Sequence, residues 1–305
     1  MLLNLIILAA SIAGLWGGAV LVVESASRIA KKLGMSELVI GLTVVAIATS
    51  APEFAVSVSA AMKGQNSISV GNVVGSNIFN LGFILGLVSI FSVMKISKEL
   101  FYRDGFVLFG AVILLTVFFI DGTLSAVEGS VLITALVFYV FYLIKKGSPG
   151  EQDVPSGKFK WTDIPLLIAG IAIIISGGHF LVESAVFLAR QFGISEWIIG
   201  ITIVAGGTSA PELATSIVAV SKGRHGISAG NLIGSDIFNI LGVLGTASVI
   251  RPLTIVSNEF TSLLLMAGSV LVLLIMMRTS WQLSKREGII LLLIAIFRWS
   301  FDFLF

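Results

Sequence analysis

Apolar runs of 18 or more residues recur along the whole of this 305-residue chain, and no other feature limits its fold as strongly. A run of that length can cross the hydrocarbon core of a bilayer as one helix. Only 12% of the residues are charged, whereas a soluble domain usually has about 25%. We therefore expect an all-α polytopic membrane protein.

Ten transmembrane helices fit this pattern of apolar runs. The expected spans cover residues 2–23, 38–62, 69–93, 104–121, 125–144, 162–183, 195–221, 227–250, 257–278 and 287–305. Of the 19 Lys and Arg residues, 15 fall in the loops on one side of these spans and four on the other. Cytoplasmic loops carry the excess of positive charge, so we expect a plasma-membrane protein with both termini outside the cell.

The sequence also repeats itself at a spacing of 159 residues. Shifted by that distance, residues 41–86 match residues 200–245 at about 25 of 46 positions, which is far above chance. A polar linker at 145–161 separates one five-helix repeat, at 1–144, from a second at 162–305. Because five is odd, the second repeat must enter the membrane from the opposite side. Inverted repeats of this kind are typical of secondary transporters, whose ion site lies near the bilayer midplane.

The strongest part of the repeat places a Thr-Ser-Ala-Pro-Glu sequence at the end of an apolar run, at residues 49–53 and again at 208–212. An ionisable residue inside a membrane costs at least about 2.5 kcal/mol and is by default a functional candidate. Glu53 and Glu212 are therefore the first candidate ligands of a cation. Each proline removes a backbone donor and interrupts the helix, which frees carbonyl oxygens that can line a cavity. Hydroxyl oxygens lie within one helical turn of each glutamate, on Thr49, Ser50, Thr208 and Ser209.

A second repeated block, Gly-Asn-x-x-Gly-Ser-x-Ile-Phe-Asn, covers residues 71–80 and 230–239. Its polar side chains recur every fourth residue and share one helical face, namely Asn72, Ser76 and Asn80 in one copy and Asn231, Ser235 and Asn239 in the other. Four helices would then meet around a cage made of oxygen, which suits a hard cation such as Ca²⁺. The alternative for each of these Ser, Thr and Asn residues is a role in helix packing alone.

Asp236 has no acidic counterpart, because Asn77 occupies the equivalent place in the first repeat. It lies three residues before Asn239, so it either contacts an ion at the edge of the cage or pairs elsewhere. The two glutamates balance two positive charges, and a third would be left uncompensated at a high cost unless Asp236 supplies a third negative charge.

The two repeated blocks resemble the alpha repeats of the sodium/calcium exchanger family, within the cation/calcium antiporter superfamily. The resemblance implies that Glu53 and Glu212 are ligands shared by the ions. It further implies oxygen ligands from Thr49, Ser50, Ser76, Thr208, Ser209 and Ser235, and from the carbonyl groups of Ala46 and Ala205. Many calcium-transporting members carry Asp at one of the two positions that are Asn80 and Asn239 in this chain. The two glutamates balance one Ca²⁺ or two Na⁺, so either Asp236 supplies a third negative charge for a third Na⁺, or the stoichiometry or the substrate differs. No cytoplasmic regulatory domain is expected, as in the prokaryotic type.

These observations predict a secondary active antiporter that exchanges Na⁺ for Ca²⁺ by alternating access, and not an enzyme. The expected partners are the two ions and the lipid bilayer, with no cofactor and no nucleic acid. A monomer is expected because one chain holds both repeats. The alternatives are an antiporter for H⁺ and Ca²⁺ or another cation pair, and a passive cation channel. Only an antiporter needs a counter-ion on the far side of the membrane.

Overall fold

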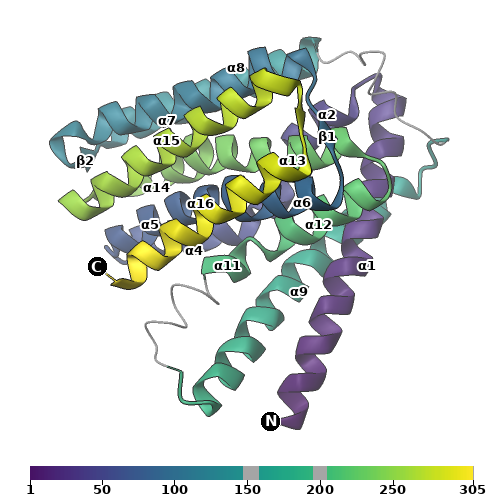
Figure 1. Cartoon of the computed structure of the whole chain (residues 1–305), viewed down its shortest axis with the longest axis horizontal. Helices are drawn as coiled ribbons and strands as arrows, with labels where there is room; N and C mark the ends of the chain where they lie inside the picture. Colours follow the sequence, from purple (N-terminus) through teal and green to yellow (C-terminus); the bar gives the residue numbers. More distant parts are fainter. Residues whose placement is uncertain (147–157, 195–204, 305) are drawn as a thin grey trace. The chain divides into compact units, whose positions relative to one another are not determined.

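The computed structural model describes residues 1–146, 158–194 and 205–304 of the chain. Helices make up nearly all of this part (Figure 1), as the apolar runs predict. The chain divides into two compact units: unit 1 comprises residues 1–52 and 146–231, and unit 2 comprises residues 53–145 and 232–305. Each unit therefore draws helices from both halves of the sequence. The linker expected at 145–161 lies mostly outside the described residues.

Unit 1 is built on one long helix from each repeat. α1 (Leu2–Leu33) and α9 (Asp163–Gln191) lie side by side (Figure 1). Gly18 allows this close approach, because a Cβ atom there would lie 2.9 Å from the backbone oxygen of Gly170. The unit also contains α2 (Glu37–Ile40), the π-helical turn η1 (Gly41–Val45), α3 (Ala46–Thr49), α11 (Ala205–Thr208) and α12 (Ala210–Ser221).

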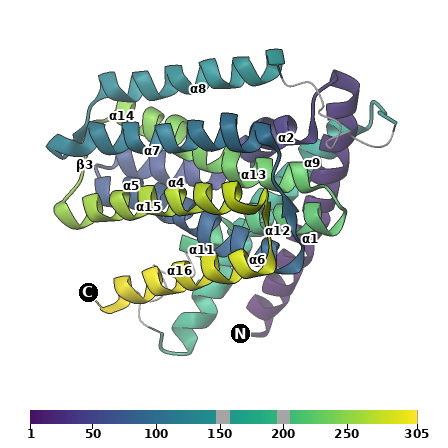
Figure 2. The ribbon, with the colours of Figure 1, turned by 45° about the horizontal axis from the view of Figure 1, so that its top comes forward.

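Unit 2 holds most of the other described helices. They are α4 (Ala51–Met62), α5 (Asn66–Ile78), η2 (Phe79–Ile84), α6 (Leu85–Phe91), η3 (Leu100–Gly105), α7 (Phe106–Phe118), η4 (Phe119–Asp121), α8 (Ala126–Lys146), α13 (His225–Phe238), η6 (Asn239–Leu244), α14 (Gly245–Ile250), α15 (Ser257–Ser280) and α16 (Lys285–Leu304). The chain enters this unit within α4 and again within α13. α15 packs along α7 (Figure 2). α16 packs on α6, where a Cβ atom on Gly86 would lie 2.9 Å from the oxygen of Gly288.

Two short strand pairs in unit 2 depart from the expected all-helical fold. β1 (Met94–Lys95) pairs antiparallel with β4 (Gln282–Leu283), and β2 (Thr123–Leu124) pairs with β3 (Leu253–Thr254). β3 lies 159 residues after β1, and β4 lies 159 residues after β2. The β1–β4 pair is therefore the repeat counterpart of the β2–β3 pair. Turn glycines with positive φ follow the same spacing, Gly34 with Gly193 and Gly64 with Gly223. Local structure therefore repeats together with the sequence.

Seven of the described helices are long and apolar enough to cross a membrane. An eighth span results if Glu37–Thr49 and Ala51–Met62, which are bent by 49° at their junction, form one broken span. The span expected at 195–221 lies partly outside the described residues, and the one expected at 287–305 falls on α16. The polytopic helical membrane fold is confirmed, while the count of ten spans stays a prediction.

Candidate cation-binding site

The helix that carries each candidate glutamate is broken just before the proline. Ser50 has φ −81° and ψ 9°, and Ser209, its counterpart in the second repeat, has φ −87° and ψ 8°. Pro211 lies in the first turn of α12, where its missing N–H group is no loss. Both glutamates also lie in the first turn of a helix, where unpaired N–H groups favour negative charge. The expected breaks near the two prolines are confirmed.

In unit 1, a buried group of oxygen-bearing side chains surrounds one glutamate. This Glu212 cluster consists of Thr49, Ser50, Glu212, Ser216 and Asn231. Ser50 Oγ donates to Glu212 Oε1 at 3.0 Å. Thr49 Oγ1 donates to Asn231 Oδ1 at 2.9 Å, and Asn231 Nδ2 donates to Ser216 Oγ at 3.1 Å. Glu212 and Ser50 are both 0% exposed, so the structure joins two of the predicted ligands deep inside the protein.

In unit 2, a similar group surrounds the other glutamate. This Glu53 cluster consists of Glu53, Ser57, Asn72 and Ser76. Ser76 Oγ donates to Glu53 Oε1 at 3.3 Å. Asn72 Nδ2 donates to Ser57 Oγ at 2.9 Å and to the backbone oxygen of Glu53 at 3.3 Å. Glu53 is 0% exposed, and two of the predicted ligands, Ser76 and Glu53, are in contact.

A second group in unit 2, the amide network, consists of Asn77, Asn80, Asp236 and Asn239. Asn80 Nδ2 donates to Asp236 Oδ1 at 3.0 Å, and Asn77 Nδ2 donates to the backbone oxygen of Asp236 at 3.1 Å. Asn239 Nδ2 donates to Asn77 Oδ1 at 3.0 Å. All four residues are buried. Asn80 and Asn239 stand at the start of the π-helical turns η2 and η6, a rare conformation that is frequent at functional sites.

The remaining predicted ligands lie at the helix breaks or on α13. Three of them are buried hydroxyl groups, on Thr208, Ser209 and Ser235. The backbone oxygen of Ala46 lies 3.3 Å from Thr49 Oγ1, whose single proton makes the shorter contact with Asn231 Oδ1 at 2.9 Å. Ala205 is the first residue of α11, directly after residues 195–204, which the structure does not describe. The role of these five positions as ion ligands, like that of the other predicted ligands, stays a prediction.

Ser57 and Ser216 are members of the two clusters that the sequence did not single out. Each accepts a hydrogen bond from an asparagine of the second repeated block, Ser57 from Asn72 and Ser216 from Asn231. The two serines are themselves 159 residues apart. The repeat spacing was the signal that could have identified them, although Ser at a matched position in a membrane helix more often serves packing.

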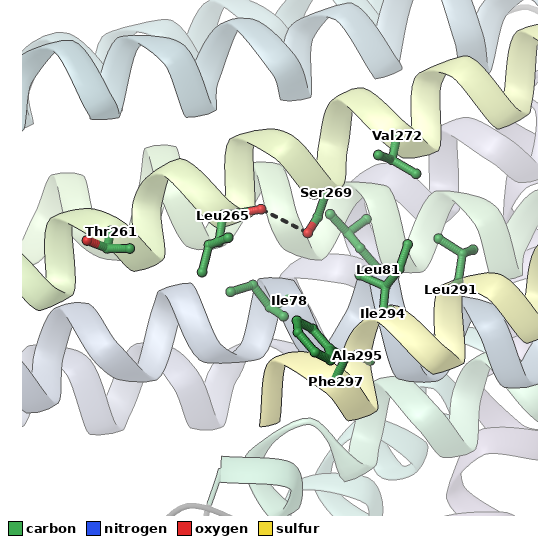
Figure 3. A pocket seen from close by; sticks show the side chains of 11 residues that line it. Ile78, Leu81, Thr261, Leu265, Ser269, Val272, Leu291, Ile294, Ala295 and Phe297 are labelled. Atoms are coloured by element: carbon green, nitrogen blue, oxygen red, sulfur yellow. Dashed lines mark hydrogen bonds between the residues drawn. The ribbon is translucent and has the colours of Figure 1, made fainter. Parts of the chain in front are cut away.

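A separate pocket of about 290 Å³ lies in unit 2, between α15, α16 and the segment of α5 and η2 (Figure 3). Its walls are mainly apolar side chains such as Ile78 and Ile294. The hydroxyl group of Ser269 points to the backbone oxygen of Leu265 and donates to it at 2.9 Å. None of the lining residues is charged, whereas hard cations prefer carboxylate and carbonyl ligands. This pocket is therefore not the candidate cation site.

Known proteins similar to this chain are ion exchangers or membrane proteins. A family model described as "Sodium/calcium exchanger protein" matches residues 3–145 and 163–301. The sodium/calcium exchanger MaX1 of Methanosarcina acetivorans is 34% identical and aligned over 96% of both chains. The inner membrane protein YrbG of Escherichia coli is 34% identical over 90% of this chain and 91% of its own. A solved structure of the sodium-calcium exchanger NCX_Mj, soaked with Na⁺ and Ca²⁺, superposes with a TM-score of 0.88 at 31% identity and covers 98% of each chain.

Proposed function

This chain belongs to the sodium/calcium exchanger family, and from that premise we propose that it exchanges Na⁺ for Ca²⁺ across the membrane by alternating access. Family membership and the NCX_Mj-like fold support a cation/Ca²⁺ antiporter, and the related proteins are exchangers and not enzymes. The resemblance carried by the repeated blocks is thereby confirmed. The choice of Na⁺ as the counter-ion and the alternating-access mechanism are the parts that we propose.

The observation that carries the proposal is the burial of two repeat-related carboxylates, Glu53 and Glu212, beside breaks in their helices. A buried carboxylate loses its hydration, which is costly unless another charge or a set of donors compensates for it. A bound cation provides such compensation, and the neighbouring hydroxyl and amide oxygens suit Na⁺ or Ca²⁺. Broken helices from two repeats are the usual ion sites of secondary transporters.

We extend the proposal to particular ligands. Glu53 and Glu212 supply the negative charges. Neutral oxygens come from the side chains of Thr49, Ser50, Ser76, Asn80, Thr208, Ser209, Ser235 and Asn239, and from the backbone of Ala46 and Ala205. Support comes from the two clusters, in which Ser50 and Ser76 already donate to a glutamate.

We also propose that the chain forms ten spans arranged as two inverted five-helix repeats. Support comes from the strand pairs and turn glycines, which recur at the spacing of the sequence repeat. The uneven distribution of Lys and Arg between the loops favours both termini outside the cell. We propose a monomer in the plasma membrane, because one chain contains both repeats.

The test is Ca²⁺ uptake into proteoliposomes that contain the purified protein. Vesicles loaded with Na⁺ and diluted into Na⁺-free buffer should take up radioactive Ca²⁺, whereas K⁺-loaded vesicles should not. Uptake driven by a pH gradient in the absence of Na⁺ would show that the counter-ion is H⁺ and not Na⁺. Uptake that requires no counter-ion would indicate a passive channel, and the proposal of antiport would then be wrong.

A further inference from the structure

Two of the three side-chain amide oxygens in the amide network are buried and have no hydrogen-bond partner among the described residues. They are Oδ1 of Asn80 and Oδ1 of Asn239. Buried polar side-chain atoms are hydrogen-bonded in the large majority of cases, so each exception needs an explanation. Side-chain carbonyl oxygens are also ligands of hard cations such as Ca²⁺.

We propose that Asp236 is a positioning residue, which orients the amide of Asn80 so that its oxygen is left to bind the transported cation. This inference rests on the proposed function, and it places Asp236 one step away from the ion. It also answers the question that the sequence left open about this residue. Asp236 pairs with an asparagine and acts through it, as residues behind a metal ligand commonly do.

The orientation of Asn80 follows from the chemistry of its partner. A carboxylate oxygen that accepts a hydrogen bond requires a donor opposite it. The amide nitrogen of Asn80 therefore faces Asp236 Oδ1, at 3.0 Å. Because the nitrogen and oxygen of an amide point in different directions, the oxygen of Asn80 is kept away from Asp236. It remains an acceptor without a donor.

The orientation of Asn239 follows from the same part of the network. The backbone oxygen of Asp236 can only accept, so Asn77 turns its nitrogen towards it at 3.1 Å. The oxygen of Asn77 is then left to face Asn239, which donates its own nitrogen at 3.0 Å. The oxygen of Asn239 is the atom that remains without a donor.

The repeat shows which property of residue 236 matters. Asn77 and Asp236 are counterparts, and so are Asn80 and Asn239. Asn77 therefore does for Asn239 what Asp236 does for Asn80, and it does so with a neutral amide oxygen. An acceptor at this position is sufficient in one copy, so we infer that the acceptor, and not the negative charge, is what the other copy needs.

The experiment measures Ca²⁺ binding to the purified full-length protein in detergent by calorimetry, together with the unfolding temperature with and without Ca²⁺. Asp236→Asn keeps an acceptor and should bind Ca²⁺ with nearly wild-type affinity. Asp236→Leu removes the acceptor and should weaken binding by about 10- to 100-fold, the usual effect of losing a group that orients a metal ligand. Asn77→Leu removes the oxygen that accepts from Asn239 and should weaken Ca²⁺ binding by a similar factor. It provides the same test if Asp236→Leu does not fold.

Asp104→Asn is the matched control, because Asp104 is another fully buried carboxylate of unit 2. It accepts from Arg103 at 2.7 Å and from Tyr139 at 2.8 Å, outside the amide network. This variant should lower the unfolding temperature and leave the Ca²⁺ affinity unchanged.

Two results would overturn the positioning role of Asp236. The first is a loss of binding in Asp236→Asn as severe as in Glu53→Gln, which would make Asp236 a ligand or a required charge. The second is wild-type affinity in both leucine variants, which would make the network purely structural. If the wild-type protein binds Ca²⁺ but does not exchange it, the proposed antiport is wrong. The positioning role of Asp236 is then still tested by the Ca²⁺ affinities of the variants. A wild-type protein that binds neither Ca²⁺ nor Na⁺ contradicts both.

Discussion

The Glu212 cluster of unit 1 and the Glu53 cluster of unit 2 share one hydrogen-bond pattern. In each, an asparagine donates to a serine and to the backbone oxygen of the glutamate: Asn231 to Ser216 and Glu212, and Asn72 to Ser57 and Glu53. The repeats differ in the amide network, where one contributes Asp236 and the other Asn77. The two repeats therefore share the asparagine bonds beside each glutamate, whereas they differ in the charge of the residue at positions 77 and 236.

The largest expected effect comes from removing either carboxylate. Glu53→Gln and Glu212→Gln should each reduce Na⁺-driven Ca²⁺ uptake to background, because each removes a charge that offsets the cation. Glutamine has nearly the same shape, so both variants should still fold, as the unfolding temperature would show. Equal losses would support the equivalence of the two clusters. Wild-type exchange in either variant would contradict it.

The hydroxyl groups beside the two glutamates should show an intermediate effect. Ser50→Ala and Ser76→Ala each remove a hydroxyl oxygen that we propose as a ligand of the cation and that contacts a glutamate. The KM for Ca²⁺ should rise about tenfold, which corresponds to a loss of about 1.4 kcal/mol of binding free energy. Ser50→Ala should have at least the effect of Ser76→Ala, because the Ser50 contact is 3.0 Å and the Ser76 contact 3.3 Å. The reverse order would contradict this ranking.

A smaller difference is expected between two repeat-related glycines at the contact of α1 and α9. A Cβ atom on Gly18 would lie 2.9 Å from a backbone oxygen, whereas the nearest atom to one on Gly177 is a side-chain carbon of Leu15 at 3.2 Å. Gly18→Ala should therefore destabilise the protein by about 1–3 kcal/mol, and Gly177→Ala by less. Denaturant unfolding of both variants measures the difference. Equal stability would show that the two helices adjust freely.

The smallest effect is expected at an exposed ion pair of unit 1. Lys222 Nζ lies 2.5 Å from Glu24 Oε1, but the two side chains are 34% and 43% exposed. Such pairs contribute at most about 1 kcal/mol and are screened by salt. Glu24→Gln should leave exchange unchanged and shift the unfolding temperature only slightly, with a smaller shift at high salt. A loss of exchange as large as that of Glu212→Gln would contradict the distinction between buried and exposed carboxylates.

Much of the candidate site could be predicted because its chemistry is local. Proline acts within one helical turn, so the breaks at Ser50 and Ser209 were expected from the prolines two residues later. The π-helical turns that begin near Asn80 and Asn239 were not expected. A π-helical turn adds one residue to a single turn of a helix. This shift is too small to be recognised in the spacing of apolar residues, and its place along the helix depends on what the helix packs against.

The membrane class, the repeat and the two glutamates followed from the sequence, because hydrophobicity, self-similarity and proline chemistry are all visible along a single chain. The hydrogen-bond partners did not. Asn80 meets Asp236 across 156 positions of sequence, and Thr49 meets Asn231 across 182. Contacts at such separations depend on how the helices pack within each compact unit. Only the tertiary structure shows that Asp236 pairs with Asn80 and that each unit contains helices from both repeats.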